Sequence, residues 1–145
     1  MRALLEPTGL FVLEEFAVEA VDMTTALWFY DACSILEAAG ILGIDKEDAA
    51  RSEPDPMLRW KAEHAHDEHG EHEALHTGEA MQSAIESAFM ALETTQAPYL
   101  YRTVCAGVDA SSRGERAAER LLALEKDRIE RGLLRAVGFR MVARP

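Results

Sequence analysis

The chain has 145 residues, of which 48% are hydrophobic and 28% are charged, and its formal net charge at pH 7 is -11. This composition is typical of a single globular domain over residues 1–145 and argues against a disordered chain. The strong negative charge argues against nucleic acid as a partner, because a phosphate backbone binds basic surfaces.

Helix-forming residues dominate the sequence. Alanine, leucine and glutamate are common and β-branched residues are sparse, which favours helix almost everywhere. No apolar run reaches the ~20 residues that a membrane-spanning helix needs, so we expect no membrane partner. Residues 1–16 carry acids and a proline and do not resemble a signal peptide. We therefore expect an all-α, cytoplasmic protein.

The first expected helix covers residues 10–39. Its three adjacent aromatic residues, Trp28, Phe29 and Tyr30, span too wide an arc to face one core. We therefore expect part of this helix to pack on another subunit, in a homodimer or larger homo-oligomer. Asp31 lies among the apolar positions, where a buried carboxylate needs a partner, so it is either a structural hydrogen-bond anchor or a site residue.

The second expected helix covers residues 57–76 and holds all five histidines. On a helix, the spacing of His69, His72 and His76 places them on one side. Imidazole is a common ligand of zinc, copper, iron and nickel. Glu73 stands three residues before His76, the spacing by which helical bundles present a carboxylate and an imidazole to one metal. These residues predict a transition-metal site that needs further ligands from other helices or another subunit.

Two other interpretations of the histidines stay open. They belong either to a solvated polar helix, in which they have no special role, or to a helix contact that responds to pH near neutrality.

The third expected helix covers residues 79–106, with a bend at Pro98. A turn at Thr77-Gly78 should separate it from the second helix, because the apolar sides of the two point in directions that differ by about half a turn. The alternative is one continuous helix through Gly78. Glu93 lies at the edge of the apolar side of the third helix.

The fourth expected helix follows a turn at residues 108–112 and continues to about Val137. Asp109, Ser111 and Ser112 are its candidate N-caps. Glu125 and Arg128 both fall on its buried side, where they either form an ion pair or leave Glu125 free to bind a metal. Four helices of this length, joined by one longer and two short connections, predict an antiparallel four-helix bundle.

Several patterns carry a family resemblance. Residues 88–93, Ala-Phe-Met-Ala-Leu-Glu, are followed by Tyr99 and a second tyrosine, and residues 118–128 contain Glu125 three residues before Arg128. Together with Glu73-x-x-His76, they resemble the ferritin-like superfamily, in particular its rubrerythrin-type members. In that family the third helix carries a liganding Glu followed by a Tyr, and two other helices each carry Glu-x-x-His.

The resemblance implies a ferritin-like bundle that holds a pair of iron or manganese ions, while the histidines by themselves leave zinc as another possible metal. Such centres carry out dioxygen or peroxide chemistry, or iron oxidation and storage. The implied ligands are His69, His72, His76, Glu73, Glu93 and Glu125. The chain departs from the pattern at Arg128, which stands where the second motif needs His. In the first helix, Glu15 and Glu19 are the nearest candidate ligands.

The sequence leaves three functions open. The first is a ferritin-like metal-binding protein with a redox or metal-handling role. The second is a histidine-rich metal buffer or carrier, and the third is a non-catalytic helical assembly or interaction protein. No catalytic triad or organic-cofactor motif is discernible, so no particular reaction is predicted.

Overall fold

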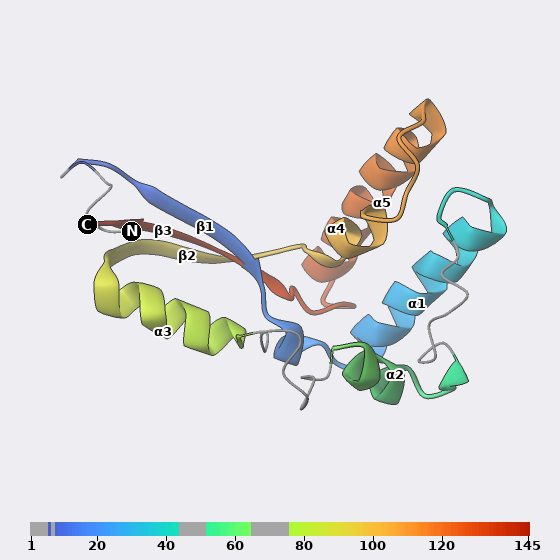
Figure 1. Cartoon of the computed structure of the whole chain (residues 1–145), viewed down its shortest axis with the longest axis horizontal. Coiled ribbons are helices and arrows are strands. Elements are labelled where there is room, and N and C mark those ends of the chain that lie inside the picture. Colours follow the sequence, from blue (N-terminus) through green and yellow to red (C-terminus); the bar gives the residue numbers. More distant parts are fainter. Residues whose placement is uncertain (1–5, 7, 44–51, 65–75) are drawn as a thin grey trace.

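The computed structural model describes residue 6 and residues 8–43, 52–64 and 76–145. Within them the chain is mixed α/β, with five α-helices, one short 3₁₀ helix and a three-stranded antiparallel sheet (Figure 1). The elements are β1 (Phe11–Phe16), η2 (Val18–Ala20), α1 (Met23–Ala38), α2 (Pro56–Glu63), α3 (Gly78–Ala88), β2 (Met90–Ala97), α4 (Leu100–Cys105), α5 (Ser112–Glu130) and β3 (Gly138–Arg144). The all-α, antiparallel four-helix, ferritin-like bundle expected from the sequence is therefore wrong.

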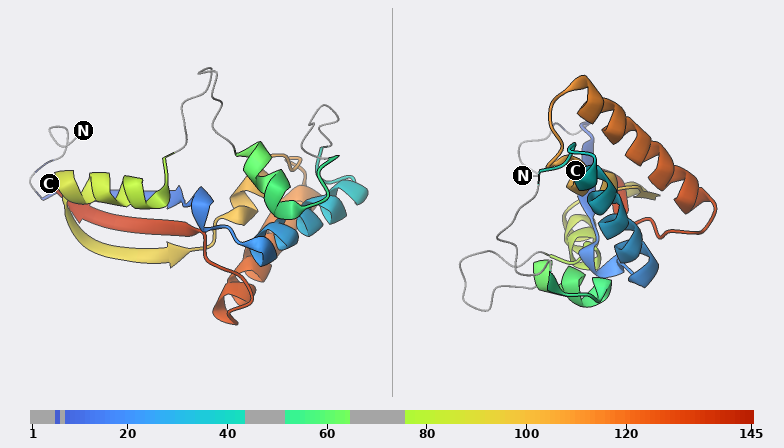
Figure 2. Two further views of the ribbon diagram at one scale, coloured as in Figure 1. Left: turned by 90° about the horizontal axis from the view of Figure 1, so that it is seen from below. Right: turned by 90° about the vertical axis from the view of Figure 1, so that its right-hand side faces the viewer.

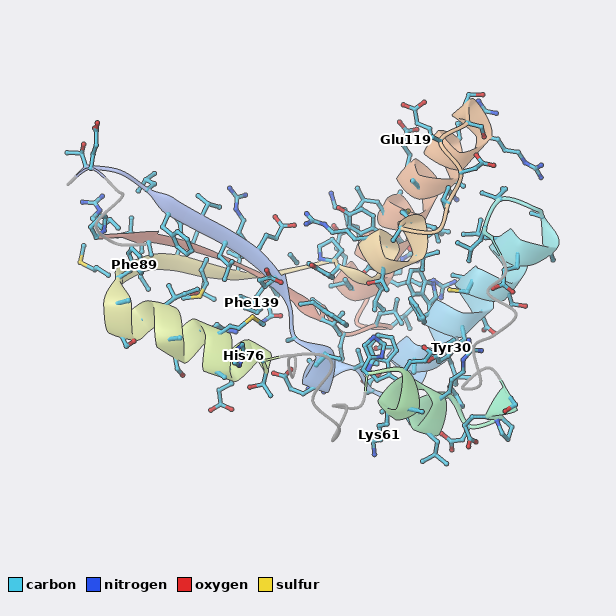
Figure 3. The ribbon with its side chains drawn as sticks, in the orientation of Figure 1. Tyr30, Lys61, His76, Phe89, Glu119 and Phe139 are labelled. Atoms are coloured by element: carbon cyan, nitrogen blue, oxygen red, sulfur yellow. The ribbon has the colours of Figure 1, made fainter. Side chains whose placement is uncertain are left out.

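The sheet has the order β1-β3-β2, so the last strand of the chain lies between the other two. Alternate residues of β3 are buried, namely Phe139, Met141 and Ala143, as the two-residue period of a strand requires. Met141 pairs with Leu13 of β1 on one side and with Thr94 of β2 on the other. Helix α3 runs along one face of the sheet (Figure 2), and Figure 3 shows the Phe139 side chain between the sheet and α3.

The other four α-helices gather beyond one end of the sheet (Figures 1 and 2). Helix α1 packs against α2 and α4, and α4 packs against α5. Their shared core is apolar and consists of Val21, Ala26, Phe29, Leu36, Trp60, Leu100, Val104, Leu121 and Val137. No helix in the described ranges combines the length and the apolar character that a membrane crossing requires.

Local sequence signals explain where the helices begin and end. A side-chain oxygen accepts backbone N–H bonds at the first turn of α1, α2, α3 and α5, from Asp22, Asp55, Thr77 and Ser111 respectively. The expected break between the second and third helices is confirmed, because α3 begins at Gly78. Ser111 is confirmed as one of the expected N-caps of the last helix. Gly40 and Gly132 follow α1 and α5 with φ of 65° and 70°, which glycine adopts without strain.

The expected helices fail where the chain forms strands. Residues 11–16, placed in the first helix, form β1, and the expected third helix divides into α3, β2 and α4. Helix α2 ends at Glu63. Helix α5 ends at Glu130, and the chain then forms the strand β3, whereas a four-helix bundle would end with its fourth helix. Strands β1 and β2 form because both find β3 as a hydrogen-bonding partner, and such pairing overrides weak local preferences.

Asp22 offers a test of the α1 cap. Its Oδ1 accepts bonds from the Thr25 backbone N and hydroxyl, at 2.9 and 2.7 Å. Burial raises the pKa of Asp22, but the bonds from Thr25 and the charge of Arg135 together outweigh it, so the pKa lies below its usual value. The stabilisation is therefore present above the pKa of the unfolded chain and lost as pH falls through the lower folded value.

Asp22→Ala should lower the free energy of unfolding by ~1 kcal/mol at pH 7. The difference from wild type should shrink as the solution is acidified below pH 3.8, the ordinary value for this carboxyl. Urea unfolding followed by circular dichroism across this pH range measures both effects. Asp22→Asn is the matched control, because it keeps a capping oxygen but does not titrate. A difference that does not change with pH would contradict this account.

Candidate functional site

The three predicted metal ligands that the structure describes, His76, Glu93 and Glu125, do not lie together. His69, His72 and Glu73 lie outside the described residues. His76 is exposed just before the first turn of α3 (Figure 3), and Glu93 is exposed on β2, at the edge of the sheet. Glu125 is buried in α5, in the helical part of the molecule. The three described candidates therefore occupy three separate places.

Glu125 has a different role from the one that either sequence interpretation gave it. Its Oε1 accepts hydrogen bonds from the backbone N–H groups of Tyr99 and Leu100, at 2.8 and 3.0 Å, and its Oε2 accepts one from Tyr101, at 2.9 Å. These are the donors at the start of α4 that a helix leaves unpaired. Glu125 thus caps α4 from a neighbouring helix and is not ion-paired with Arg128.

The charge of the Glu125 carboxylate also affects the pKa of the Cys105 thiol. Burial raises the pKa of Cys105, and the negative charge of Glu125 raises it further, so the thiol is held in its neutral form. Cys105 is partly buried and packs against the helical core as a small apolar side chain.

A ferritin-like metal centre is not supported by this arrangement. In the part of the chain that the structure describes, no three His, Cys, Asp or Glu side chains gather closely enough to hold a metal ion. The fold also lacks the four-helix bundle that such a centre requires. The four-helix bundle is thus corrected, whereas the ferritin-like resemblance and a bound iron or other transition metal stay predictions. That His69, His72 and Glu73 take part in a transition-metal site stays a prediction, because they lie outside the described residues.

A groove of about 640 Å³ lies between α1 and α5. Its lining is mainly apolar and consists of Thr24, Leu27, Trp28, Asp31, Ala32, Ile35, Leu36, Ala117, Arg120, Leu121, Leu124, Arg128, Leu133 and Leu134. We call it the α1–α5 groove. Its size falls in the range of protein sites that bury a substantial partner or ligand.

Helix α1 presents apolar side chains on two sides, which explains how the groove arises. Ala26 and Phe29 face the helical core and are buried. Leu27 and Ile35 point the other way, into the groove, and remain 46% and 68% exposed. Leu133, just beyond α5, is 54% exposed in the same groove. Exposed apolar side chains gathered in one place mark an interaction surface on most proteins.

Charged groups of both signs also line the groove. Asp31 is exposed on α1 and is not the buried anchor that the sequence suggested. Arg120 and Arg128 stand on α5. Among the described residues, no side-chain hydrogen bond or ion pair engages Asp31, and the Nε of Arg128 is buried with no hydrogen-bond partner. Buried donors are almost always paired in folded proteins, so this atom is exceptional.

A second polar cluster connects α1 to α2. The Tyr30 hydroxyl donates to Glu63 at 2.7 Å, and Arg59 lies over the Tyr30 ring while its Nε donates to Glu63. Burial raises the pKa of Tyr30, and the bond to Glu63 raises it further, so the phenol stays protonated. This cluster ties two helices together and has the character of a structural contact.

The sequence predicted only the wall of the groove that the first helix forms. The excess of apolar residues around Trp28 predicted an outward-facing side of the first helix, and Trp28 does line the groove. The contribution of Leu124, Leu133 and Leu134 to the groove was not predicted from the sequence. Comparisons with protein-family models, with curated proteins and with solved structures found no match to this chain. They leave the family resemblance untested, and only the fold that it implied is shown to be wrong.

Proposed function

We propose that this chain is an assembly protein that associates with a second copy of itself through the α1–α5 groove. The observation that carries the proposal is the open apolar groove, in which Leu27, Ile35 and Leu133 are each about half exposed or more. The sequence independently predicted an oligomer through the same helix. The sheet and α3 then form a separate part of each subunit, left accessible by this mode of association.

The magnitudes indicate how wide the contact must be. Full burial of one Leu or Ile side chain contributes roughly 1.5–3 kcal/mol, so covering three half-exposed ones contributes about 3 kcal/mol. Association costs about 4–15 kcal/mol in lost freedom. The three side chains alone do not overcome that cost. The proposed interface therefore includes more of the facing surfaces of α1 and α5.

A second copy fits the groove better than a partner of one charge. The groove carries an acid on one wall and two arginines on the other, so it has both signs that a self-complementary surface requires. Leu27 and Ile35, which are exposed along one wall of the groove, supply apolar surface that a second copy can cover. Two-fold association of this kind is the commonest form of oligomer.

Light scattering coupled to size exclusion tests the proposal. We expect the wild-type chain to be a dimer at micromolar concentrations and Ile35→Lys to be a monomer with an unchanged near-ultraviolet circular dichroism spectrum. Leu58→Lys is the matched control, because Leu58 is 53% exposed on α2 and lies outside the groove, and it should remain dimeric. A monomeric wild-type chain, or loss of the dimer in both variants, would overturn the proposal.

A further inference from the structure

Arg128 contains a buried donor that the described chain leaves unused. Its Nε is inaccessible to solvent and has no hydrogen-bond partner, although the residue lines the α1–α5 groove. A guanidinium cannot lose its proton to escape this situation. Because Nε is buried, an acceptor that approaches through the groove would meet the terminal nitrogens of the guanidinium, which also have no hydrogen-bond partner among the described residues.

Asp31 is the acceptor that fits. It is the one carboxylate among the described residues that line the groove, and it is exposed on the opposite wall from Arg128. Within the described part of one chain, no ion pair involves Asp31. A planar guanidinium recognises a carboxylate through parallel hydrogen bonds, which makes this combination the natural one for a charged contact at the edge of an apolar interface.

A two-fold axis can bring Asp31 of one subunit to Arg128 of the other. In a two-fold interface, a contact from residue i to residue j occurs twice, because the second copy repeats it in the opposite direction. One acid and one arginine on the same surface then give two ion pairs. We propose, building on the self-association proposed above, that the dimer is two-fold and that Asp31 of each subunit pairs with Arg128 of the partner subunit. This pairing sets the register of the two grooves.

Charge reversal with mixing is the central test. Asp31→Lys and Arg128→Glu should each weaken the dimer at least ~10-fold in Kd at low salt, because each homodimer then holds two like-charged contacts. An equimolar mixture of the two variants should restore dimers to near wild-type affinity. In that heterodimer, the introduced lysine of one chain faces the introduced glutamate of the other, and the remaining native Asp31 faces the remaining native Arg128. Sedimentation equilibrium measures all four samples.

Arg120 provides a matched control, because it lines the same groove on the same helix. Mixing Asp31→Lys with Arg120→Glu should not restore the dimer. Restoration by Arg120→Glu instead of Arg128→Glu would overturn the pairing. Assemblies that grow beyond the dimer with concentration would overturn the two-fold geometry.

A double-mutant cycle covers the case in which Arg128→Glu does not fold. Arg128→Met keeps most of the apolar stem, and Asp31→Asn alters only an exposed group. If the two residues pair, the double variant should dimerise no more weakly than the weaker single variant. Strictly additive losses of dimer affinity would overturn the pairing. Self-association would still be supported if the Ile35→Lys variant were monomeric. The two proposals thus fail through different results.

Discussion

Replacing Glu125 with alanine should lower the free energy of unfolding by about 3–5 kcal/mol. The Glu125 side chain is only 1% exposed, and its two oxygens accept three backbone N–H bonds from residues 99–101. Alanine leaves those three donors without partners at the start of α4. Each buried, unpaired donor costs about 1–3 kcal/mol, so even the lower values sum to about 3 kcal/mol. Because α4 lies between α1 and α5, the loss should reach the whole helical part.

Urea unfolding at pH 7, followed by far-ultraviolet circular dichroism, measures this effect. Glu119→Ala is the matched control, since Glu119 is exposed on the same helix (Figure 3) and should change stability by no more than ~0.5 kcal/mol. Glu125→Gln should fall between the two, because an amide keeps one acceptor oxygen but its nitrogen cannot accept. Equal losses in Glu125→Ala and Glu119→Ala would show that the α4 cap contributes little.

The sequence predicted the features that depend on neighbouring residues. The break before Gly78 and the cap at Ser111 are local signals, and both are confirmed. The outward apolar side of the first helix followed from the arc of Trp28 and its neighbours, and this side does line the groove. These predictions succeeded because helix geometry is set within a few residues.

The sheet was missed because its pairing is not local. Phe11–Phe16 reads FVLEEF, which suits a helix face as well as a strand, and its partner β3 begins only at Gly138. Likewise, Met90–Ala97 has few strand-forming residues other than Thr94 and Thr95, yet it pairs with β3 along most of its length. The stabilising hydrogen bonds join segments far apart in the chain, so a window along the sequence does not detect them.

The role of Glu125 was missed for the same reason. Its position three residues before Arg128 suggested an ion pair or a metal ligand, since both interpretations use only nearby residues. Its actual partners are N–H groups that lie 24 to 26 residues earlier in the sequence, at the start of another helix. The family resemblance assigned the same glutamate to a metal centre, and it too gave no indication of these backbone donors.

Trp60 fixes α2 to the rest of the helical part. It is 3% exposed, and its ring meets Phe16 and Phe29 edge-to-face, with centroids 5.8 and 5.3 Å apart. It also stacks on His64 at 3.9 Å, and its indole N–H donates to the Val18 carbonyl at 3.4 Å. Helix α2 has eight residues, too few to be stable on its own. Its order therefore depends on these contacts.

Trp60→Ala should accordingly lower the free energy of unfolding by about 3–5 kcal/mol, the usual cost of removing a buried Trp. Hydrogen exchange read by mass spectrometry should show faster exchange across residues 56–63 than in the wild-type chain. Leu58→Ala is the matched control, because Leu58 is 53% exposed on the same helix and its truncation should leave both measurements nearly unchanged. If Trp60→Ala behaved like Leu58→Ala, the aromatic contacts would not hold α2, and its attachment would depend on the Tyr30–Glu63 bond instead.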